Sequence, residues 1–281
     1  MKKVLFVTGK WLNSDINQPT ASNYDDIIYT FPKDVSDYDY DIISLDESVI
    51  LYNQHADTAI VKYCSKVDVD IVIIVRVGLY EGNPSSNCLY ALKQMGKKVC
   101  FFWLDSNPWD IQYQETYKQF IDLNVTWDAP SFNGNLYKNT DSNQLYLWAL
   151  TSDILHHPIE FPQVPVGFIG SLRYQKRAEY IPYVKEQIPE LVINGGQREC
   201  NLTAFDYGRL ISNSKININF PQHGMGYEQV KQRVIQVIAS KSLLLENENA
   251  STRSLLAPGQ DYVEFGTKED LCEKIRYYLE H

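Results

Sequence analysis

Short apolar runs recur along the first half of the chain, and amphipathic stretches separate several of them. The runs predict strands and the amphipathic stretches predict helices, because apolar positions repeat every second residue in a half-buried strand and once per turn in a helix. The predicted strands cover residues 4–8, 42–45, 71–75, 99–104 and 124–127, and the predicted helices cover residues 85–95 and 110–120. The alternation of strand and helix from residue 71 to 127 predicts a parallel sheet with right-handed crossovers, the build of a Rossmann-like unit.

The same alternation begins again at residue 166. Predicted strands at 166–170, 191–194, 216–220, 242–246 and 262–265 alternate with predicted helices at 175–187, 204–213, 228–240 and 268–278. With 281 residues the chain is long enough for two ordinary domains. The expected division is a Rossmann-like domain at 1–150, a linker at 151–165 and a second Rossmann-like domain at 166–278, and residues 279–281 look like the start of a histidine tag.

The predicted helix 228–240 follows a loop of small residues, 223–227. Its spacing places Gln229, Arg233 and Gln236 on one polar face. The opposite face is apolar and consists of Val230, Val234, Val237 and Ile238. Free N–H groups at a helix N-terminus, the positive end of the helix dipole and an arginine can bind one anion together. The anion expected at this helix is a phosphate.

A second cationic group follows the predicted strand 166–170. Gly170 and Ser171 end the strand, and Arg173 and Arg177 lie near the first turn of the helix that begins at Gln175. Two guanidinium forks beside backbone N–H groups form a diphosphate clamp, although an arginine pair of this kind is also compatible with a solvated helix start. Gly195 and Gly196 allow either close approach to a flat base or an ordinary tight turn.

Asp105 follows the predicted strand 99–104 directly, so we expect it at the carboxyl edge of the first sheet, where open α/β sheets bind ligands. A carboxylate there can take the proton from an attacking hydroxyl as a general base. Asp105 is equally placed to cap a helix that begins near Trp109. Both roles stay open from the residues alone.

Candidate metal ligands are weak in this sequence, and no metal is expected. The acidic runs Asp37–Asp41 and Asp68–Asp70 precede strands, at the amino edge of the sheet, where turn residues are more common than ligands. His156 and His157 are adjacent, so their side chains point apart in an extended segment, which favours packing in the linker. The five cysteines form no Cys-x-x-Cys pair and are expected to be buried, reduced thiols.

Charge and hydropathy exclude several classes of function. The net charge of −9 disfavours a broad nucleic-acid-binding surface, which would usually be basic. No apolar run approaches the roughly 18 residues of a membrane span and no signal peptide is evident, so a cytoplasmic location is expected. The first strand is not followed by Gly-x-Gly-x-x-Gly, which disfavours a dinucleotide-dependent dehydrogenase.

Several segments resemble GT-B glycosyltransferases, in particular the CgeB-like (spore-maturation) group and the DNA glucosyltransferases of T-even phages. Residues 231–246 resemble their arginine-bearing helix and the strand after it, and the order helix, apolar strand, Pro258-Gly259, strand, helix then continues to residue 278. Residues 148–157 resemble the domain crossover of the CgeB-like enzymes. Residues 102–108, which contain Asp105, are similar to the strand that ends in the catalytic aspartate of the phage enzymes, and the spacing of Ser171, Arg173 and Arg177 is similar to their serine and two arginines.

The resemblance implies a GT-B fold, in which two Rossmann-like domains face a central cleft, and an inverting, metal-independent transfer of sugar from a nucleotide donor, expected to be a UDP-sugar. Asp105 would be the base, and Gly170, Ser171, Arg173, Arg177 and Arg233 would bind the diphosphate. Gln236 stands where the family usually has a glutamate for the ribose. A small molecule, protein or glycan is the favoured acceptor. The alternatives are a phage-type enzyme acting on hydroxymethylated DNA and a non-catalytic protein that binds a nucleotide-sugar.

Overall fold

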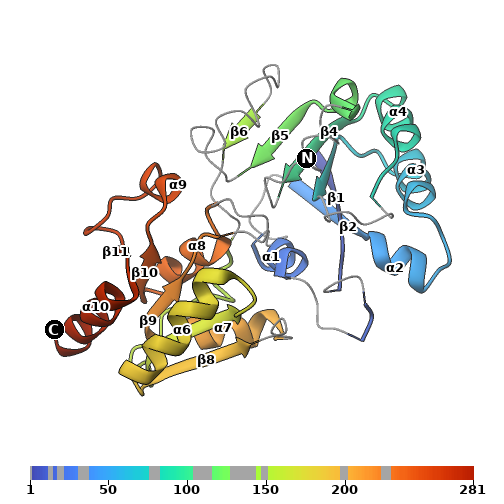
Figure 1. Cartoon of the computed structure of the whole chain (residues 1–281). Coiled ribbons are helices and arrows are strands. Elements are labelled where there is room, and N and C mark those ends of the chain that lie inside the picture. The colour runs from blue at the N-terminus through green and yellow to red at the C-terminus, as the bar shows by residue number, and fades with distance from the viewer. Residues whose placement is uncertain are drawn as a thin grey trace. The chain divides into compact units, whose positions relative to one another are not determined.

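The chain divides into two units, Met1–Trp148 and Ala149–His281. The computed structural model describes residues 2–11, 15–17, 22–30, 38–75, 83–103, 116–126, 144–146, 151–196, 202–222 and 229–281. Each unit is a parallel sheet flanked by helices (Figure 1), as the alternating pattern predicted.

The first unit is built on a six-stranded sheet in the order β2-β1-β3-β4-β5-β6, and all neighbouring strands are parallel. Its last strand, β6, was not predicted from the sequence. The strands are β1 (Lys2–Thr8), β2 (Tyr38–Ser44), β3 (Ile71–Val75), β4 (Lys98–Trp103), β5 (Leu123–Thr126) and β6 (Gln144–Tyr146). The helices are α1 (Ser22–Thr30), α2 (Leu45–Ile50), α3 (Ala56–Lys66), α4 (Ser86–Gln94) and a 3-10 turn, η2 (Lys118–Phe120).

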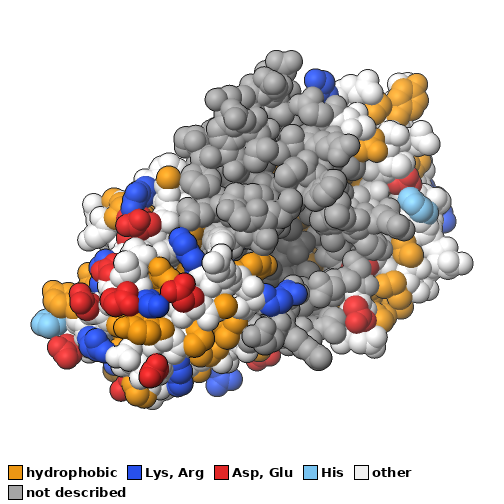
Figure 2. Space-filling view, viewed as in Figure 1, with side chains coloured by type: hydrophobic (Ala, Val, Ile, Leu, Met, Phe, Trp, Pro, Cys, Tyr) orange, Lys and Arg blue, Asp and Glu red, His pale blue; other side chains and the backbone are white. Residues whose placement is uncertain are grey.

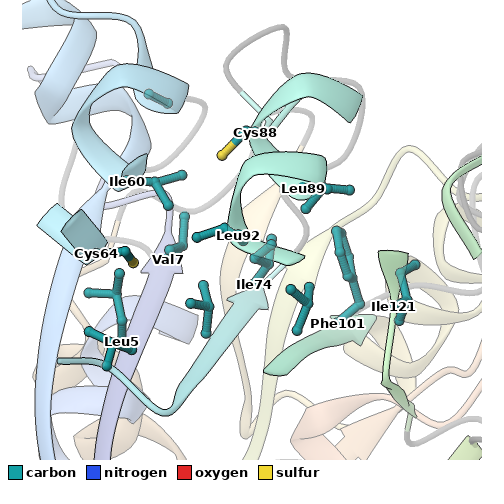
Figure 3. Close-up of a cluster of buried hydrophobic side chains, with 14 of the residues drawn as sticks. Leu5, Val7, Ile60, Cys64, Ile74, Cys88, Leu89, Leu92, Phe101 and Ile121 are labelled. Carbon is teal, nitrogen blue, oxygen red and sulfur yellow. The ribbon is translucent and has the colours of Figure 1, made fainter. Parts of the chain in front are cut away.

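The core of the first unit lies between its central strands and the helices α3 and α4 (Figure 3). Leu5 and Val7 of β1 and Ile74 of β3 are fully buried there against Ile60 of α3 and Leu89 of α4. Consecutive residues of β1 are buried, so both faces of this strand are covered, which explains why its sequence is a continuous apolar run. The helix predicted at 110–120 is described only from residue 116, where the 3-10 turn η2 occupies its end.

The second unit has a five-stranded parallel sheet in the order β11-β10-β9-β7-β8. Its strands are β7 (Val164–Ser171), β8 (Leu191–Gly196), β9 (Ser214–Asn219), β10 (Leu243–Asn247) and β11 (Val263–Phe265). Its helices are α6 (Gln175–Gln187), α7 (Ala204–Ser212), α8 (Gln232–Ala239), α9 (Ala250–Arg253) and α10 (Lys268–Glu280). Helix α6 has the bounds predicted from the sequence, and every other predicted strand and helix of this unit is present with shifted ends.

Two apolar clusters pack this second sheet. One contains Ile181 of α6 and Leu271 of α10, together with Phe168 and Phe220. The other contains Ile211 of α7 and the valines of α8. Strand side chains alternate between the faces of a sheet, so two helix pairs covering different clusters make the doubly wound arrangement of a Rossmann-like unit.

The acidic runs near the amino ends of β2 and β3 have structural partners. Asp39 and Asp41 lie inside β2, which begins earlier than predicted, and each forms an ion pair with Lys3 at 2.9 and 2.8 Å. Asp70 accepts a hydrogen bond from the backbone of Lys3. Their assignment as turn residues was therefore wrong for β2, and Asp37 lies outside the described residues. Within the described ranges, no group of three His, Cys, Asp or Glu side chains is placed to hold a metal ion.

Two further predictions concern the cysteines and the C-terminal residues. Four of the five cysteines are described, and all four are free and buried, as predicted; burial raises the pKa of Cys64 to about 11. Residues 279–280 continue α10, and Leu279 packs against the core, so the fold extends beyond residue 278, where the second domain was predicted to end.

None of the helices in the described ranges has the length and apolar character needed to cross a membrane.

Candidate functional site

Two guanidinium groups meet at Gly170, near the carboxyl end of β7. A Cβ atom placed on Gly170 would lie 3.6 Å from Nη1 of Arg177 and 3.6 Å from Nη2 of Arg233. Arg177 comes from α6 and Arg233 from α8, two helices that follow different strands. The missing side chain at Gly170 therefore leaves a small space bordered by two positive charges.

Arg177 is held in a buried position. Its side chain is 6% exposed, its Nη2 donates to the carbonyl oxygen of Phe220 at 3.1 Å, and its guanidinium lies 4.7 Å from the ring centroid of Tyr174. Its Nε is buried and has no hydrogen-bond partner among the described residues. A buried guanidinium with an unused donor is costly unless a ligand completes its hydrogen bonds.

Arg233 is held by two side chains from neighbouring elements. Its Nε donates to Oη of Tyr207 in α7 at 2.9 Å, and its Nη1 donates to Oδ1 of Asn219 in β9 at 3.0 Å. Asn219 in turn donates from Nδ2 to Oε2 of Glu246, at the end of β10, at 2.6 Å. These contacts leave Nη2 as the part of the guanidinium that borders Gly170.

The electrostatics of this group are unusual for a folded interior. Neither Arg177 nor Arg233 forms an ion pair with a carboxylate of the described residues; Glu246 reaches Arg233 only through Asn219. Burial, and after it the charge of Arg233, lowers the pKa of Arg177 to about 10, so Arg177 stays positive at neutral pH. Two adjacent guanidinium groups repel each other, and a dianion between them would remove that repulsion.

The prediction for the helix that carries Arg233 was partly wrong. Helix α8 begins at Gln232, with Lys231 as its N-cap, so Gln229 precedes the helix. Gln236 is 2% exposed, although it lies about 200° around the helix from the buried Val234. Both the apolar side of α8 and the side that carries Gln236 are therefore covered. The loop 223–227 lies outside the described residues, and the ribose role of Gln236 stays a prediction.

Ser171 and Arg173 form a local unit beside the pair. The Ser171 hydroxyl oxygen accepts from the backbone N–H of Arg173 at 3.2 Å and from its Nε at 3.1 Å. Arg173 is exposed, in contrast to Arg177. The structure thus brings together two of the three predicted arginines at Gly170, while Arg173 folds back onto Ser171; its part in binding a diphosphate stays a prediction.

Gly195 and Gly196 belong to strand β8, so the tight-turn alternative was wrong. Gly195 has φ of +127° and pairs with Gly170 across the β7–β8 ladder. A Cβ at Gly195 would lie 2.9 Å from the carbonyl carbon of Gly170. Packing against β7 is thus sufficient reason for glycine there, and contact with a base stays a prediction.

His156 packs on the second unit, as the sequence favoured. Its side chain is 2% exposed and meets the ring of Tyr207 edge-on, with 6.3 Å between centroids. Burial lowers the pKa of His156 to about 4, so the ring is neutral at physiological pH. His157 is exposed, in contrast to His156. Asp105, the predicted base, lies outside the described residues.

Sequence reasoning missed the residues that support the arginines, namely Tyr207, Asn219 and Glu246. A signal was available for two of them, because Asn219 and Glu246 are polar residues at the ends of apolar strands. Such residues lie at the carboxyl edge of a parallel sheet, where ligands bind. Nothing in the sequence indicated that Asn219 and Glu246 would meet.

Comparison with known families covers the second unit. Residues 154–281 match the family model described as "Glycosyl transferase-like". A search of curated protein sequences gave no significant match.

Comparison with solved structures covers the whole chain. HepE of Anabaena, solved with UDP and glucose, has a TM-score of 0.60 at 9% identity, over 100% of this chain and 90% of that one. AviGT4, a glycosyltransferase of avilamycin A biosynthesis, has a TM-score of 0.60 at 10% identity, over 100% and 88% of the two chains. The DNA-modifying enzyme β-glucosyltransferase has a TM-score of 0.55 at 15% identity, over 100% and 89%.

These identities are low, so the structural similarity establishes the fold and not the activity. A UDP-GlcNAc 2-epimerase from Methanocaldococcus jannaschii is also similar, with a TM-score of 0.55 at 10% identity over 100% of this chain and 93% of that one. The predicted fold class is confirmed: the chain has a GT-B fold, with two Rossmann-like parallel-sheet units, and its second unit matches the glycosyl transferase-like family.

Proposed function

We propose that this protein is a metal-independent glycosyltransferase that takes its sugar from a nucleotide donor, with UDP-sugars as the first candidates. The observation that carries the proposal is the pair of guanidinium groups at Gly170, from the buried Arg177 and the half-buried Arg233, neither of which has a carboxylate partner among the described residues. The pair lies at the carboxyl edge of the second sheet, in the unit that matches the glycosyl transferase-like family.

The chemistry suits a leaving diphosphate. When the bond between the anomeric carbon and the donor oxygen breaks, negative charge grows on the diphosphate, and preorganised guanidinium groups stabilise it without a divalent ion. Arg177 and Arg233 would supply the two main contacts, with Gly170 providing room and Ser171 and Arg173 beside them. Gln236 would bind the ribose, as an amide in place of the carboxylate usual in GT-B enzymes.

Asp105 would deprotonate the acceptor hydroxyl, and direct attack would invert the configuration at the anomeric carbon. UDP is favoured as the nucleotide because HepE, of the same fold, was solved with UDP. The resemblance of residues 231–246 to the CgeB-like group supports the same activity class. The acceptor is proposed to be a small molecule, a protein or a glycan, since the chain is acidic overall. On the face drawn in Figure 2, acidic and basic side chains are interspersed over the described surface.

The test is a binding and hydrolysis panel. Wild-type protein is titrated calorimetrically with UDP, GDP and their sugars, in the presence of EDTA, and Arg177→Met and Arg233→Met are compared with the exposed control Arg276→Met. Each site variant should lose about tenfold to a hundredfold in affinity, the value of one charge-assisted contact, while the control should bind as wild type does. Binding that depends on added metal, or that survives both site substitutions, would contradict the proposal.

Donor hydrolysis then separates the activities that this fold can support. A transferase releases UDP slowly from its donor in the absence of acceptor, and Asp105→Asn should lower transfer to an acceptor while donor affinity is kept. UDP-sugar binding without release of UDP by any sugar donor would indicate a non-catalytic binding protein. Conversion of UDP-GlcNAc to its 2-epimer would indicate an epimerase, and salt-sensitive glucosylation of hydroxymethylated DNA would indicate a DNA glucosyltransferase.

A further inference from the structure

Asn219 links the site to a carboxylate that the proposed reaction does not use. Asn219 is fully buried at the end of β9, accepting from Arg233 through Oδ1 and donating to Glu246 through Nδ2. A guanidinium can only donate hydrogen bonds, so the amide oxygen has to face Arg233 and the amide nitrogen has to face Glu246. The orientation of Asn219 is thus fixed by its two neighbours.

Glu246 is fully buried at the end of β10. Its Oε2 accepts from Asn219, and its Oε1 lies 3.5 Å from the hydroxyl of Thr252. Among the described residues, the charged or titratable groups that act on it are Arg233 of α8, Arg177 of α6 and Tyr262, which precedes β11. Asn249, the residue before α9, also faces it. A carboxylate in this position has to be fixed by hydrogen bonds, because burial without them is costly.

Asn219 separates the carboxyl group of Glu246 from the guanidinium of Arg233, and this separation affects how Arg233 can bind an anion. A carboxylate in direct contact with Arg233 would neutralise the guanidinium and occupy the donors that a diphosphate needs. With Asn219 between them, Nε and Nη1 of Arg233 are used for orientation, and Nη2 stays at Gly170 beside Nη1 of Arg177. When Glu246 is ionised, its negative charge offsets the repulsion between the two arginines at a distance.

We propose that Asn219 and Glu246 are positioning residues that hold Arg233 for the leaving diphosphate, with Asn219 as an insulating amide between the two charges. This inference rests on the proposed function, because it assigns the pair of arginines to a diphosphate. It adds two residues that touch neither donor nor acceptor. Their role is to fix the orientation in which Arg233 binds the diphosphate.

The test separates folding from positioning with four variants. Asn219→Asp replaces the amide by a carboxylate, which pairs with Arg233 directly and repels Glu246. The double variant Asn219→Asp with Glu246→Gln removes that repulsion, because the glutamine amide can donate to the new carboxylate. Glu246→Gln alone keeps an acceptor for Asn219. Asn217→Asp is the control, since Asn217 is a buried amide of the same strand that bonds to Ser242 and Ile211 instead of Arg233.

Affinity for UDP-glucose and midpoint of urea unfolding are measured for each variant. Asn219→Asp should weaken binding by about tenfold or more and lower the midpoint. The double variant should recover most of the midpoint but not the affinity, since Arg233 remains paired with a carboxylate. Asn217→Asp should lower the midpoint and leave the affinity of the folded fraction within about twofold, because it leaves the arginines unchanged.

Recovery of affinity along with stability in the double variant would overturn the proposal, and so would an equal loss of affinity in Asn217→Asp. Either result would mean that Asn219 serves the fold alone. Failure of the proposed function is distinguishable, because wild-type protein would then bind no nucleotide-sugar. In that case inorganic pyrophosphate at one fixed pH replaces UDP-glucose as the probe. If wild type binds pyrophosphate but the variants show no loss, or if wild type binds neither probe, the positioning role is rejected.

Discussion

Gly195 of β8 lies so close to the backbone of Gly170 of β7 that a larger residue has no room at position 195. The two are register partners in the parallel ladder, with φ of +127° at Gly195 and +146° at Gly170. A Cβ on Gly195 would meet the backbone of Gly170, which cannot move aside as a flexible side chain would. The same Gly170 borders both guanidinium groups, so packing between the strands and the shape of the candidate site are fixed at one point.

Substitution of Gly195 by alanine should therefore destabilise the second unit. We expect the free energy of unfolding to fall by about 2 kcal/mol or more, because backbone strain and a backbone clash add together. Gly259→Ala is the matched control: its φ is also positive, at +79°, but nothing lies within 4 Å of the new Cβ. Urea unfolding followed by circular dichroism measures both variants. Equal losses would show that the clash with Gly170 contributes nothing.

Removal of the buried charge of Arg177 should have opposite effects on binding and on folding. Arg177→Met relieves the repulsion from Arg233 and the cost of burying a guanidinium, so the free protein should unfold at an equal or higher urea concentration than wild type. The same variant should bind UDP-glucose about tenfold to a hundredfold more weakly. A large loss of stability in the free protein would instead assign Arg177 a structural role. Arg276→Met, at an exposed position, controls for the general effect of losing one positive charge.

His156 should make stability depend on pH below neutrality. Its folded-state pKa is about 4, below the ordinary value of 6.5, so the unfolded chain binds the proton more tightly. The contribution is complete above pH about 6.5 and is lost as pH falls toward about 4, with a size of about 3 kcal/mol. His156→Phe keeps the ring contact with Tyr207 and should flatten this part of the profile. Replacement of the exposed neighbour, His157→Phe, should leave it unchanged, and the reverse result would contradict the assignment.

Glu246 should make the protein less stable as pH rises, which is the opposite of the effect of His156, over a neighbouring pH range. Burial raises its folded-state pKa to about 7, above the ordinary 4.5, against the hydrogen bond from Asn219 and the charge of Arg233. Its contribution to stability is complete below pH about 4.5 and is lost as pH rises through about 7. Urea unfolding of wild type and Glu246→Gln across this range should show the difference between them growing with pH. A difference that does not vary with pH would mean that Glu246 stays in one protonation state.

The sequence by itself determined the alternation of strands and helices and the residue types at strand ends. Helix α6 was predicted with its observed bounds, because an amphipathic helix leaves a local signal in the order of residues. The sequence also suggested Arg173, Arg177 and Arg233 as one diphosphate-binding group, and the structure brings Arg177 and Arg233 of these to Gly170. Strand β6 left no such signal, since Gln144–Tyr146 is three residues long and becomes a strand only by pairing with β5.

Tertiary structure decided which polar residues meet. Gln236 was predicted on a polar face of its helix, and the tertiary structure alone decides that this position is buried, at 2% exposure. Asn219 and Glu246 lie 27 positions apart and become hydrogen-bonded because β9 and β10 are neighbours in the sheet. Local sequence sets the period of a strand or helix, whereas the pairing of strands, which joins distant residues, depends on how the whole sheet buries its two faces. The position of Arg233 depends on this strand pairing, because Asn219, which holds it, is itself held by Glu246 of the neighbouring strand.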